Sequence, residues 1–282
     1  MTRRTVLITG GSDGLGAVAA GLAASRGERV LIVGRNPEKT AAVAERTGAE
    51  PFVADFSELD QVRELAERIR SAVSHEGAGI DALANNAGGI FREEQLTVDG
   101  NELTLQVNHL SPFLLTRLLM DELLAGDGAT IVNTSSIAHR LWGDIALDDL
   151  DNVRGYSPEK AYGDAKLANA MFARALHERY ADRGIAAVAF HPGIVATGFA
   201  GDTTSVLRWL YGSPLAKPFL TTAQRGGETL DRFLSGRPGA DWKPGAYYSK
   251  RRLGRLLNPQ LLDDRIVNGL WERSAERVGI AS

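Results

Sequence analysis

The segment TVLITGGSDGLG near the amino terminus restricts the possible folds more than any other part of the sequence. A run of β-branched and aliphatic residues, Thr5 to Thr9, leads directly into glycines at positions 10, 11, 14 and 16. A strand that ends in glycines before a helix can bind an anion, because N–H groups at the helix start point outward and the helix dipole favours negative charge. Glycine also adopts positive φ and lets a phosphate approach the backbone. We therefore expect a phosphate-bearing ligand at this turn.

Short apolar runs alternate with longer helical patterns along most of the chain. We expect strands at 5–9, 29–34, 50–55, 81–88, 129–136, 185–193 and 245–249. Between two of them, the segment 59–73 places apolar residues three or four apart on one stripe, which is typical of a helix. Strands that are apolar throughout are buried on both faces, as in a parallel sheet covered by helices. The alternation predicts an α/β fold: a doubly wound parallel sheet of seven strands with helices on both faces.

Composition excludes several classes of function. The chain has no cysteine, which removes disulfides, thiolate catalysis and cysteine-ligated zinc. A net charge of -3 and the lack of a long basic run give no reason to expect nucleic acid as a partner. We find no leader pattern and no apolar stretch of the roughly 18–20 residues that span a bilayer. We expect a cytoplasmic protein without a membrane anchor, in which residues 1–282 form one domain.

Six motifs follow one another in a fixed order: TGxxxGxG from Thr9, NNAG at 85–88, Asn108 in VNHLSPF, IVNTSS at 131–136, YGDAK at 162–166 and HPG at 191–193. Together they resemble the short-chain dehydrogenase/reductase family, over nearly the whole chain. The RN dipeptide at 35–36, LANAMFARAL and HPGIVAT are similar to its retinol-dehydrogenase-like and WW-domain-oxidoreductase-like members. The resemblance implies a single Rossmann-type NAD(P)-binding domain, with a substrate lid at about 199–220.

Tyr162 and Lys166 are the candidate centre of the chemistry. They are four residues apart in a strongly helical segment and therefore share one helix face. A neighbouring ammonium favours the phenolate and lowers a tyrosine pKa that is ordinarily about 10. Tyr162 could then act as a general acid or base, giving its proton to a carbonyl oxygen as hydride reaches the carbon, or the reverse. The resemblance implies that Lys166 also bonds the nicotinamide ribose.

Ser136 is expected to bond the substrate oxygen and stabilise the charge that develops there. Ser135 is the alternative, and the resemblance favours the second serine of the pair. Asn108 matches the family position at which a helix opens and a water links the side chain to the lysine; an ordinary bond to backbone is the alternative. His109 and His191 are expected to be structural.

An insert at about 140–160 lengthens the loop beside this site. Ser136 and Tyr162 are 26 residues apart, about twice the usual family gap, and a similar insert occurs in the retinol-dehydrogenase-like group. Its acids, Asp148, Asp149 and Asp151, are expected to form a solvated surface rather than a metal site. No metal-ligand spacing occurs elsewhere, so we expect no metal.

Arg35 favours NADP(H) as the cofactor, with NAD(H) as the alternative. A fold that binds NAD ordinarily offers an acid about twenty residues after the glycine turn, whereas here the second strand ends in Gly34, Arg35 and Asn36. The planar guanidinium of arginine suits a 2′-phosphate. Asp13 could repel that phosphate or could cap the helix that starts at Gly14.

The resemblance also assigns contacts along the whole dinucleotide. The glycine turn would contribute Gly10, Ser12, Asp13, Gly14, Leu15 and Gly16. Asp55 would contact the adenine amino group and Phe56 would supply a backbone contact. The adenosine ribose side would be lined by Asn86, Ala87 and Gly88, and the nicotinamide carboxamide would be held by Pro192, Gly193, Ile194 and Thr197.

The large apolar residues of the lid suggest a lipophilic small molecule that carries a ketone, aldehyde or alcohol. Two other functions remain open: an NADP(H)-binding sensor or scaffold without catalysis, and reduction of a carbon–carbon double bond. By family habit, the helices that hold Asn108 and Tyr162 pair across a two-fold, which implies a homodimer or homotetramer. The basic segment SKRRLGR at 249–255 is expected to be a solvated loop.

Overall fold

Eight strands form the main sheet of the computed structural model, which describes residues 3–74, 79–126, 128–195 and 220–281. Their order across the sheet is β10-β9-β6-β5-β4-β1-β2-β3. The strands are β1 (Thr5–Thr9), β2 (Arg29–Gly34), β3 (Glu50–Val53), β4 (Ala82–Asn85), β5 (Thr130–Thr134), β6 (Ala186–His191), β9 (Tyr247–Ser249) and β10 (Arg252–Leu253). A separate parallel pair is made by β7 (Ile194–Val195) and β8 (Leu220–Thr221).

The seven predicted strands are all present in the sheet and pair in parallel, with Leu7 of β1 opposite Leu31 of β2 and Leu83 of β4. The predicted strand number is wrong by one. The basic segment at 249–255 forms the hairpin that adds β10, and its residues Arg252 and Leu253 pair antiparallel with β9. A strand of two residues is too short to show any alternation in the sequence.

The helices follow the predicted alternation, and several begin at clear capping residues. Asn36 and Ser157 accept hydrogen bonds from the backbone N–H three residues on, and each is followed by a proline at the first helical position. The α-helices are α1 (Gly14–Ser25), α2 (Pro37–Thr47), α3 (Leu59–Ser74), α4 (Leu103–Leu105), α5 (Ser111–Leu118), α6 (Met120–Leu124), α7 (Ala138–Leu141), α8 (Pro158–Tyr180), α10 (Ala223–Ser235) and α11 (Asp264–Arg277). Shorter turns are the π-helical η1 (Gln106–Leu110) and the 3₁₀ turns η2 (Ala181–Arg183) and η5 (Pro259–Leu262).

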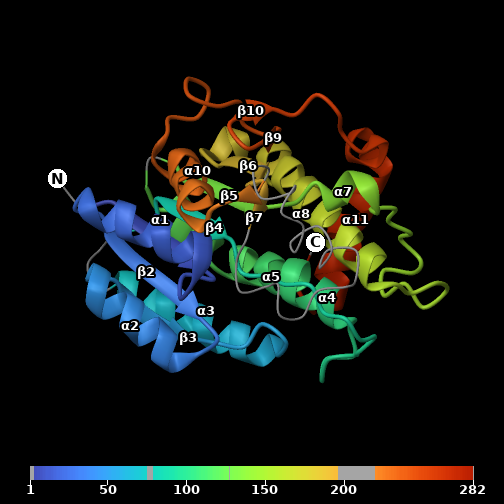
Figure 1. The fold of residues 1–282 in the computed structure, drawn as a ribbon, viewed down its shortest axis with the longest axis horizontal. Helices are drawn as coiled ribbons and strands as arrows, with labels where there is room; N and C mark the ends of the chain where they lie inside the picture. The colour runs from blue at the N-terminus through green and yellow to red at the C-terminus, as the bar shows by residue number, and fades with distance from the viewer. Residues whose placement is uncertain (1–2, 75–78, 127, 196–219, 282) are drawn as a thin grey trace.

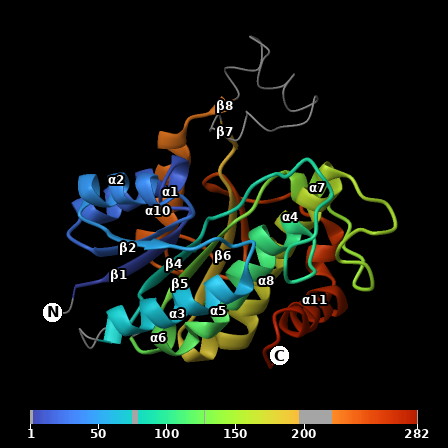
Figure 2. The same cartoon turned by 90° about the horizontal axis from the view of Figure 1, so that it is seen from below.

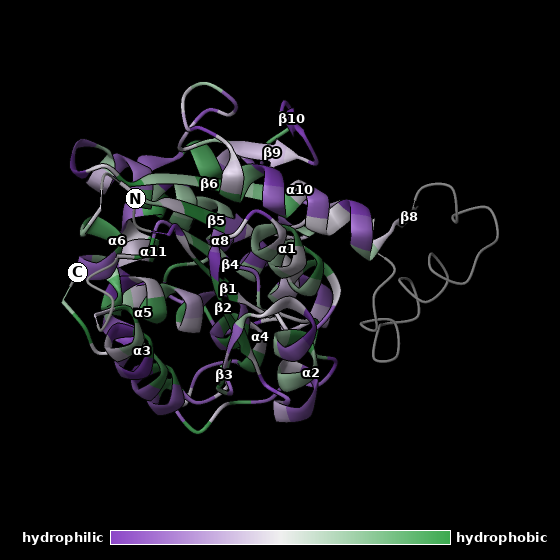
Figure 3. Ribbon diagram, turned by 90° about the vertical axis from the view of Figure 1, so that its left-hand side faces the viewer, coloured by the Kyte–Doolittle hydropathy of each residue, from purple (hydrophilic) through white to green (hydrophobic). Residues whose placement is uncertain are grey.

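The sheet lies between two layers of helices (Figures 1 and 2). Because side chains alternate across a strand, Val6 and Ile8 of β1 pack into the core under α1, α2 and α10, whereas Leu7 packs into the core under α3, α5 and α8. Figure 3 shows hydrophobic residues in the strands and hydrophilic residues on the outer helices α2 and α3. The layers therefore bury the sheet on both faces, as predicted.

The strand order reverses between β1 and β4, since the chain builds β2 and β3 on one side of β1 and β4 on the other. Ligands of such sheets bind outside the carboxyl ends of the strands at this reversal. The loops that follow β1, β4, β5 and β6 all leave from that edge. They carry the glycine turn, the NNAG motif, the serine pair and the HPG motif, so the fold brings these four motifs to one end of the sheet.

Helix α11 lies across the outer layer beside α5 and α8. Trp271 of α11 packs against Phe113 of α5, with ring centroids 5.1 Å apart, and against Phe172 of α8 at 5.9 Å. His109 Nε2 of η1 and Ser274 Oγ of α11 are 2.8 Å apart. The carboxyl-terminal helix thus covers the two helices that hold the candidate site.

Candidate active site

The glycine turn is tightly folded and could not accept larger residues. Gly10 and Gly14 have φ of 65° and 53°, in the left-handed region that glycine adopts readily. A Cβ on Gly16 would lie 2.2 Å from Gly10 O, so the first turn of α1 sits directly on the end of β1. Asp13 Oδ1 accepts a 2.7 Å hydrogen bond from Gly14 N, which makes Asp13 the cap of α1. This is one of its two predicted roles, and its other oxygen lies 3.3 Å from Lys39 Nζ.

The NNAG loop is fastened to the glycine turn through Thr9. The Thr9 hydroxyl accepts hydrogen bonds from Asn86 N and Ala87 N at 3.0 and 3.1 Å and donates to Ala84 O at 3.0 Å. Asn86 Nδ2 donates to Thr9 O at 3.1 Å. No role was predicted for Thr9, although the threonine that opens TGxxxGxG is the residue that joins the loops after β1 and β4.

Asn108 holds the next residues of this loop from a π-helical turn. Its Nδ2 donates to Gly89 O and Thr104 O, both at 2.8 Å, and its Oδ1 accepts from Gly89 N at 3.1 Å. A Cβ on Gly88 would lie 2.3 Å from Asn108 Oδ1. The helix is locally opened at η1, as the resemblance implied. The Asn108 side chain bonds backbone atoms, which is the alternative interpretation given above.

Tyr162 and Lys166 share one face of α8, with Lys166 Nζ 5.5 Å from the centroid of the Tyr162 ring. Tyr162 is half-buried, whereas Lys166 is buried and its Nζ donates one 3.3 Å hydrogen bond, to Thr134 O. Burial lowers the pKa of Lys166 to about 7, because the charged form loses its hydration. Without a bound anion, the ammonium that should activate Tyr162 is therefore only partly present at neutral pH.

The two serines have different environments. Ser135 is buried, and its hydroxyl donates a 2.7 Å hydrogen bond to Lys166 O. Ser136 is half-buried, and its Oγ accepts a 3.2 Å hydrogen bond from Ala138 N, which leaves its own O–H able to donate. The Ser135 hydroxyl donor is thus already used, whereas that of Ser136 is available, and the choice of Ser136 for the substrate oxygen stays a prediction.

Four of the residues assigned to the adenosine end lie in the loops after β2 and β3. Arg35 is exposed directly after β2, while Asn36 Oδ1 is used to cap α2 through Lys39 N at 2.9 Å. Asp55 Oδ1 accepts from Ser57 N at 2.9 Å, which folds the loop after β3. Phe56 is buried, and its carbonyl accepts from Ser111 Oγ at 2.6 Å.

The HPG motif turns sharply after β6. Gly193 has φ of 104°, and a Cβ there would lie 2.1 Å from Thr221 Oγ1. Its N–H donates to His191 Nδ1 at 3.3 Å. Pro192 and Ile194 flank this turn, whereas Thr197 and the lid up to residue 219 lie outside the described residues.

Neither of the two histidines considered above is a base for neutral pH. Burial lowers the pKa of His109 to about 4, and burial with the charges of His139 and Lys250 lowers the pKa of His191 to about 4. Both are therefore neutral imidazoles in the working range, and a structural role fits them.

The acids of the insert bind cations of the protein itself. Asp148 and Asp149 pair with Arg154, and Asp151 pairs with Arg277 of α11 at 2.5 Å. Asp151 Oδ1 also accepts from Glu102 N at 2.8 Å. In the described part of the chain, no cluster of three His, Asp or Glu side chains could hold a metal ion.

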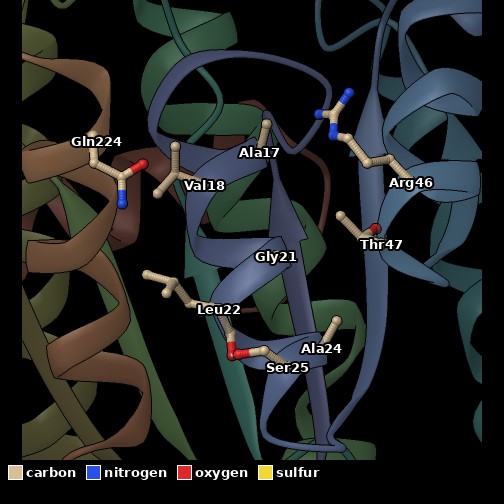
Figure 4. A pocket seen from close by; sticks show the side chains of 9 residues that line it. All are labelled: Ala17, Val18, Gly21, Leu22, Ala24, Ser25, Arg46, Thr47 and Gln224. Atoms are coloured by element: carbon tan, nitrogen blue, oxygen red, sulfur yellow. The ribbon is translucent and has the colours of Figure 1, made fainter.

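A surface groove of about 530 Å³ lies away from these residues (Figure 4). Gln224 of α10 lines one side and Arg46 and Thr47 of α2 line the other, with α1 between them. Arg46 is its one charged lining residue. The groove contains none of the candidate catalytic residues, so we do not assign the chemistry to it.

Comparison with known proteins relates this arrangement to a family. The sequence pattern described as "short chain dehydrogenase" matches residues 4–206. The chain is 42% identical to "Putative daunorubicin C-13 ketoreductase DnrU" of Streptomyces sp. (strain C5), over 98% of this chain and 93% of that protein. It is 34% identical to human retinol dehydrogenase 12, over 98% of this chain and 87% of that protein.

Solved structures agree with the fold. A protein from Mycobacterium paratuberculosis superposes with a TM-score of 0.76 at 30% identity, covering 99% of this chain and 94% of that one. The NADPH-bound carbonyl reductase from chicken fatty liver superposes with a TM-score of 0.67 at 21% identity, covering 90% of this chain and 99% of that one. At that identity the second likeness concerns the fold alone.

Proposed function

Because the chain belongs to the short-chain dehydrogenase/reductase family and is an NAD(P)-dependent oxidoreductase of keto or alcohol groups, we propose that it interconverts a ketone or aldehyde and an alcohol on a lipophilic small molecule with NADP(H). The observation that carries the proposal is the placement of Tyr162 and Lys166 on one face of α8, with Lys166 Nζ 5.5 Å from the Tyr162 ring. The loop that carries Ser136 lies beside them, since Ser135 Oγ bonds Lys166 O.

The residues at the end of the sheet fit a dinucleotide. Gly10 and Gly16 have no room for a side chain, and Ser12, Gly14 and Leu15 between them are half-buried, so backbone N–H groups of this turn could meet a phosphate. Lys166 Nζ has three N–H donors, one bonded acceptor and almost no exposure to water, so ribose hydroxyls would suit its remaining donors. When bound, the nicotinamide would supply or accept the hydride.

The chain's own side chains would control the proton and the substrate oxygen. Tyr162 would hold the proton that the carbonyl oxygen receives on reduction and would take it back on oxidation. Ser136 would donate a hydrogen bond to the same oxygen as negative charge develops there. The charged ammonium of Lys166 would favour the phenolate form of Tyr162. A nearby anion would raise the pKa of Lys166 and so keep that ammonium charged.

A preference for NADP(H) over NAD(H) is supported at the end of β2. A Cβ on Gly34 would lie 2.3 Å from Thr40 Oγ1, so an acid that binds ribose hydroxyls has no room there. Arg35 is exposed on the next residue, and Lys39 lies one turn into α2. Asp13 of the glycine turn already faces Lys39, with Oδ2 3.3 Å from Lys39 Nζ.

Binding measurements test this preference with a matched pair of variants. We expect Arg35→Ala to weaken NADPH binding by about 10- to 100-fold, the worth of a charge-assisted hydrogen bond, and to leave NADH binding unchanged. Asp13→Asn keeps the helix cap and removes the charge, so NADPH affinity should not fall. Equal losses for NADPH and NADH in Arg35→Ala would overturn the preference.

Replacement of the tyrosine tests the reaction itself. Tyr162→Phe should lower kcat by at least about 100-fold while NADPH still binds, since the variant loses only the transferable proton. Tyr156→Phe is the matched control, because Tyr156 lies in the insert and its hydroxyl bonds Glu93 O at 3.3 Å. Near wild-type turnover in Tyr162→Phe would refute the mechanism.

The substrate panel follows from the relatives. Ketones related to daunorubicin and retinoid aldehydes are the first compounds to test, with simple lipophilic ketones beside them. A protein that binds NADPH but consumes none with any of them would be a sensor or scaffold instead. A product reduced at a carbon–carbon double bond would indicate the third chemistry.

Localisation and assembly belong to the same proposal. None of the helices in the described ranges combines the length and apolar character that a membrane crossing requires. A cytoplasmic location stays a prediction. A homodimer or homotetramer also stays a prediction, and the position of α11 over α5 and α8 bears on it, as discussed below.

A further inference from the structure

A buried histidine, His139, holds the backbone of Ser136. His139 Nδ1 lies 2.6 Å from Ser136 O, and the His139 backbone N–H donates to the same oxygen at 3.2 Å. A carbonyl oxygen can only accept, so the hydrogen of the neutral ring is on Nδ1. One residue therefore holds the Ser136 carbonyl through both its main chain and its side chain.

The two serines depend on different parts of the structure. Ser135 is fixed to the body of the sheet, since its N–H donates to Phe190 O at 2.8 Å and its hydroxyl to Lys166 O at 2.7 Å. The hydrogen bonds found for Ser136 in the described part of the chain run to α7, through Ala138 N and His139. The direction of the Ser136 hydroxyl thus follows the position of α7.

His139 is itself held rigidly. Its ring is fully buried and packs on the ring of Tyr247, with centroids 4.4 Å apart. Asn258 Nδ2 donates to His139 O at 2.9 Å and to Gly143 O at 2.7 Å, which ties α7 to the carboxyl-terminal part of the chain. Burial lowers the pKa of His139, with a further contribution from the charge of Arg140, so the ring is neutral at pH 7.

Packing alone does not account for a histidine at this position. His139 Nε2 and Tyr247 Oη are both buried, and neither has a hydrogen-bond partner among the residues that the structure describes. Buried polar atoms are ordinarily bonded, and leaving one unbonded costs stability. An apolar side chain would fill the same space without that cost. The bond from Nδ1 to Ser136 O is what a histidine adds.

We propose that His139 is a positioning residue, which sets the direction of the Ser136 hydroxyl toward the substrate oxygen by holding the Ser136 carbonyl. The proposal rests on the ketone and alcohol chemistry proposed above. It assigns no contact between His139 and substrate or cofactor. Its consequence is that loss of the Nδ1 bond lowers turnover while the cofactor still binds.

Two substitutions at one position separate this role from packing. His139→Asn carries an amide N–H close to the place of Nδ1 and can still donate to Ser136 O, whereas His139→Leu cannot. We expect His139→Leu to lower kcat by up to about 100-fold, since a misplacement of about 1 Å can cost that much. We expect His139→Asn to recover most of that loss. The affinity for NADPH should be unchanged in both.

A third variant provides the control for removal of an imidazole ring. His177 is half-buried in α8, and its Nδ1 lies 3.4 Å from Ile185 O, near the amino end of β6 and away from Ser136. His177→Leu therefore removes an imidazole bond to a backbone carbonyl and should leave kcat unchanged. Melting temperatures of all three variants report any general loss of folding.

A double-mutant cycle shows whether His139 acts through Ser136. If it does, His139→Leu should lower kcat by less than about two-fold when Ser136 is already alanine, because there is no hydroxyl left to direct. Full additivity with Ser136→Ala, or equal losses in His139→Asn and His139→Leu, would overturn the proposal. Turnover by the unchanged enzyme in the same assay keeps this result separate from the proposed function.

Discussion

Replacing Lys166 with methionine should make the nucleotide-free protein more stable and inactive. Lys166 is buried, and its pKa of about 7 means that burial of the ammonium costs free energy. Methionine has a similar length and no charge. Its introduction removes one hydrogen bond to Thr134 O, but that oxygen keeps the 3.1 Å bond from Asn169 Nδ2.

The size of the gain follows from the two pKa values. The gap between about 7 in the folded protein and about 10.4 in the unfolded chain corresponds to roughly 5 kcal/mol, at about 1.4 kcal/mol per pH unit. This cost is fully present below pH 7, where both states are protonated. Above pH 7 the folded protein releases the proton and the unfolded chain keeps it, so stability rises with pH until about 10.4.

The advantage of Lys166→Met should therefore be largest at pH 6 and shrink toward pH 10. With about 2 °C per kcal/mol for a domain of this size, the melting temperature should rise by roughly 10 °C at pH 6. Circular dichroism melts of the nucleotide-free protein at pH 6, 7.5 and 9 measure this. Lys243→Met, at an exposed position, should show no comparable trend. A less stable Lys166→Met at pH 6, or a difference independent of pH, would refute the reasoning.

Three further outcomes follow from the structure. Gly16→Ala should abolish nucleotide binding and destabilise the fold, because its Cβ would lie 2.2 Å from a backbone oxygen. Gly21→Ala on the same helix has 3.8 Å of clearance and should stabilise the fold by up to about 1 kcal/mol. Calorimetry and NADPH titration compare the two variants, and similar results for both would contradict the account of the turn. Ser136→Ala should lower kcat with an unchanged melting temperature. Ser135→Ala should lower the melting temperature by about 2–4 °C, because it loses a hydrogen bond worth about 1 kcal/mol. The opposite pattern would mean that Ser135 bonds the substrate oxygen and Ser136 is structural. Light scattering should give the mass of two or four chains of 30.3 kDa, paired through a face other than α5 and α8, and a mass of one chain would contradict the proposed homodimer or homotetramer.

The sheet and its helices could be predicted because the apolar pattern that identifies each element lies within its own segment of the sequence. Strands such as β1 and β6 are apolar throughout, and helices such as α3 carry an apolar stripe, so periodicity alone separates them. The same holds for Tyr162 and Lys166, whose spacing fixes their common face wherever α8 lies. The strand that was missed, β10, has only two residues and forms through pairing with β9.

Features that depend on contacts distant in sequence could not be predicted. The hydroxyl of Ser135 is bonded to Lys166 O, across 31 residues, and this contact distinguishes Ser135 from Ser136. The insert is fastened by Asp151 to Arg277, which is 126 residues away. No local pattern marks these pairs, because each partner alone looks like an ordinary surface or helix residue.

The same distant contacts argue against pairing through α5 and α8. A second copy could reach that face only if α11 moved away, which would expose Trp271 and its neighbours Val267, Leu270 and Ala275, all now buried. An indole of 150–250 Å² costs roughly 4–6 kcal/mol to expose at about 25 cal/mol per Å². The pairing would also break the bond between Ser274 and His109. An interface there would have to offset this cost before it could stabilise a dimer. The carboxyl-terminal helix therefore occupies the place that a partner would take.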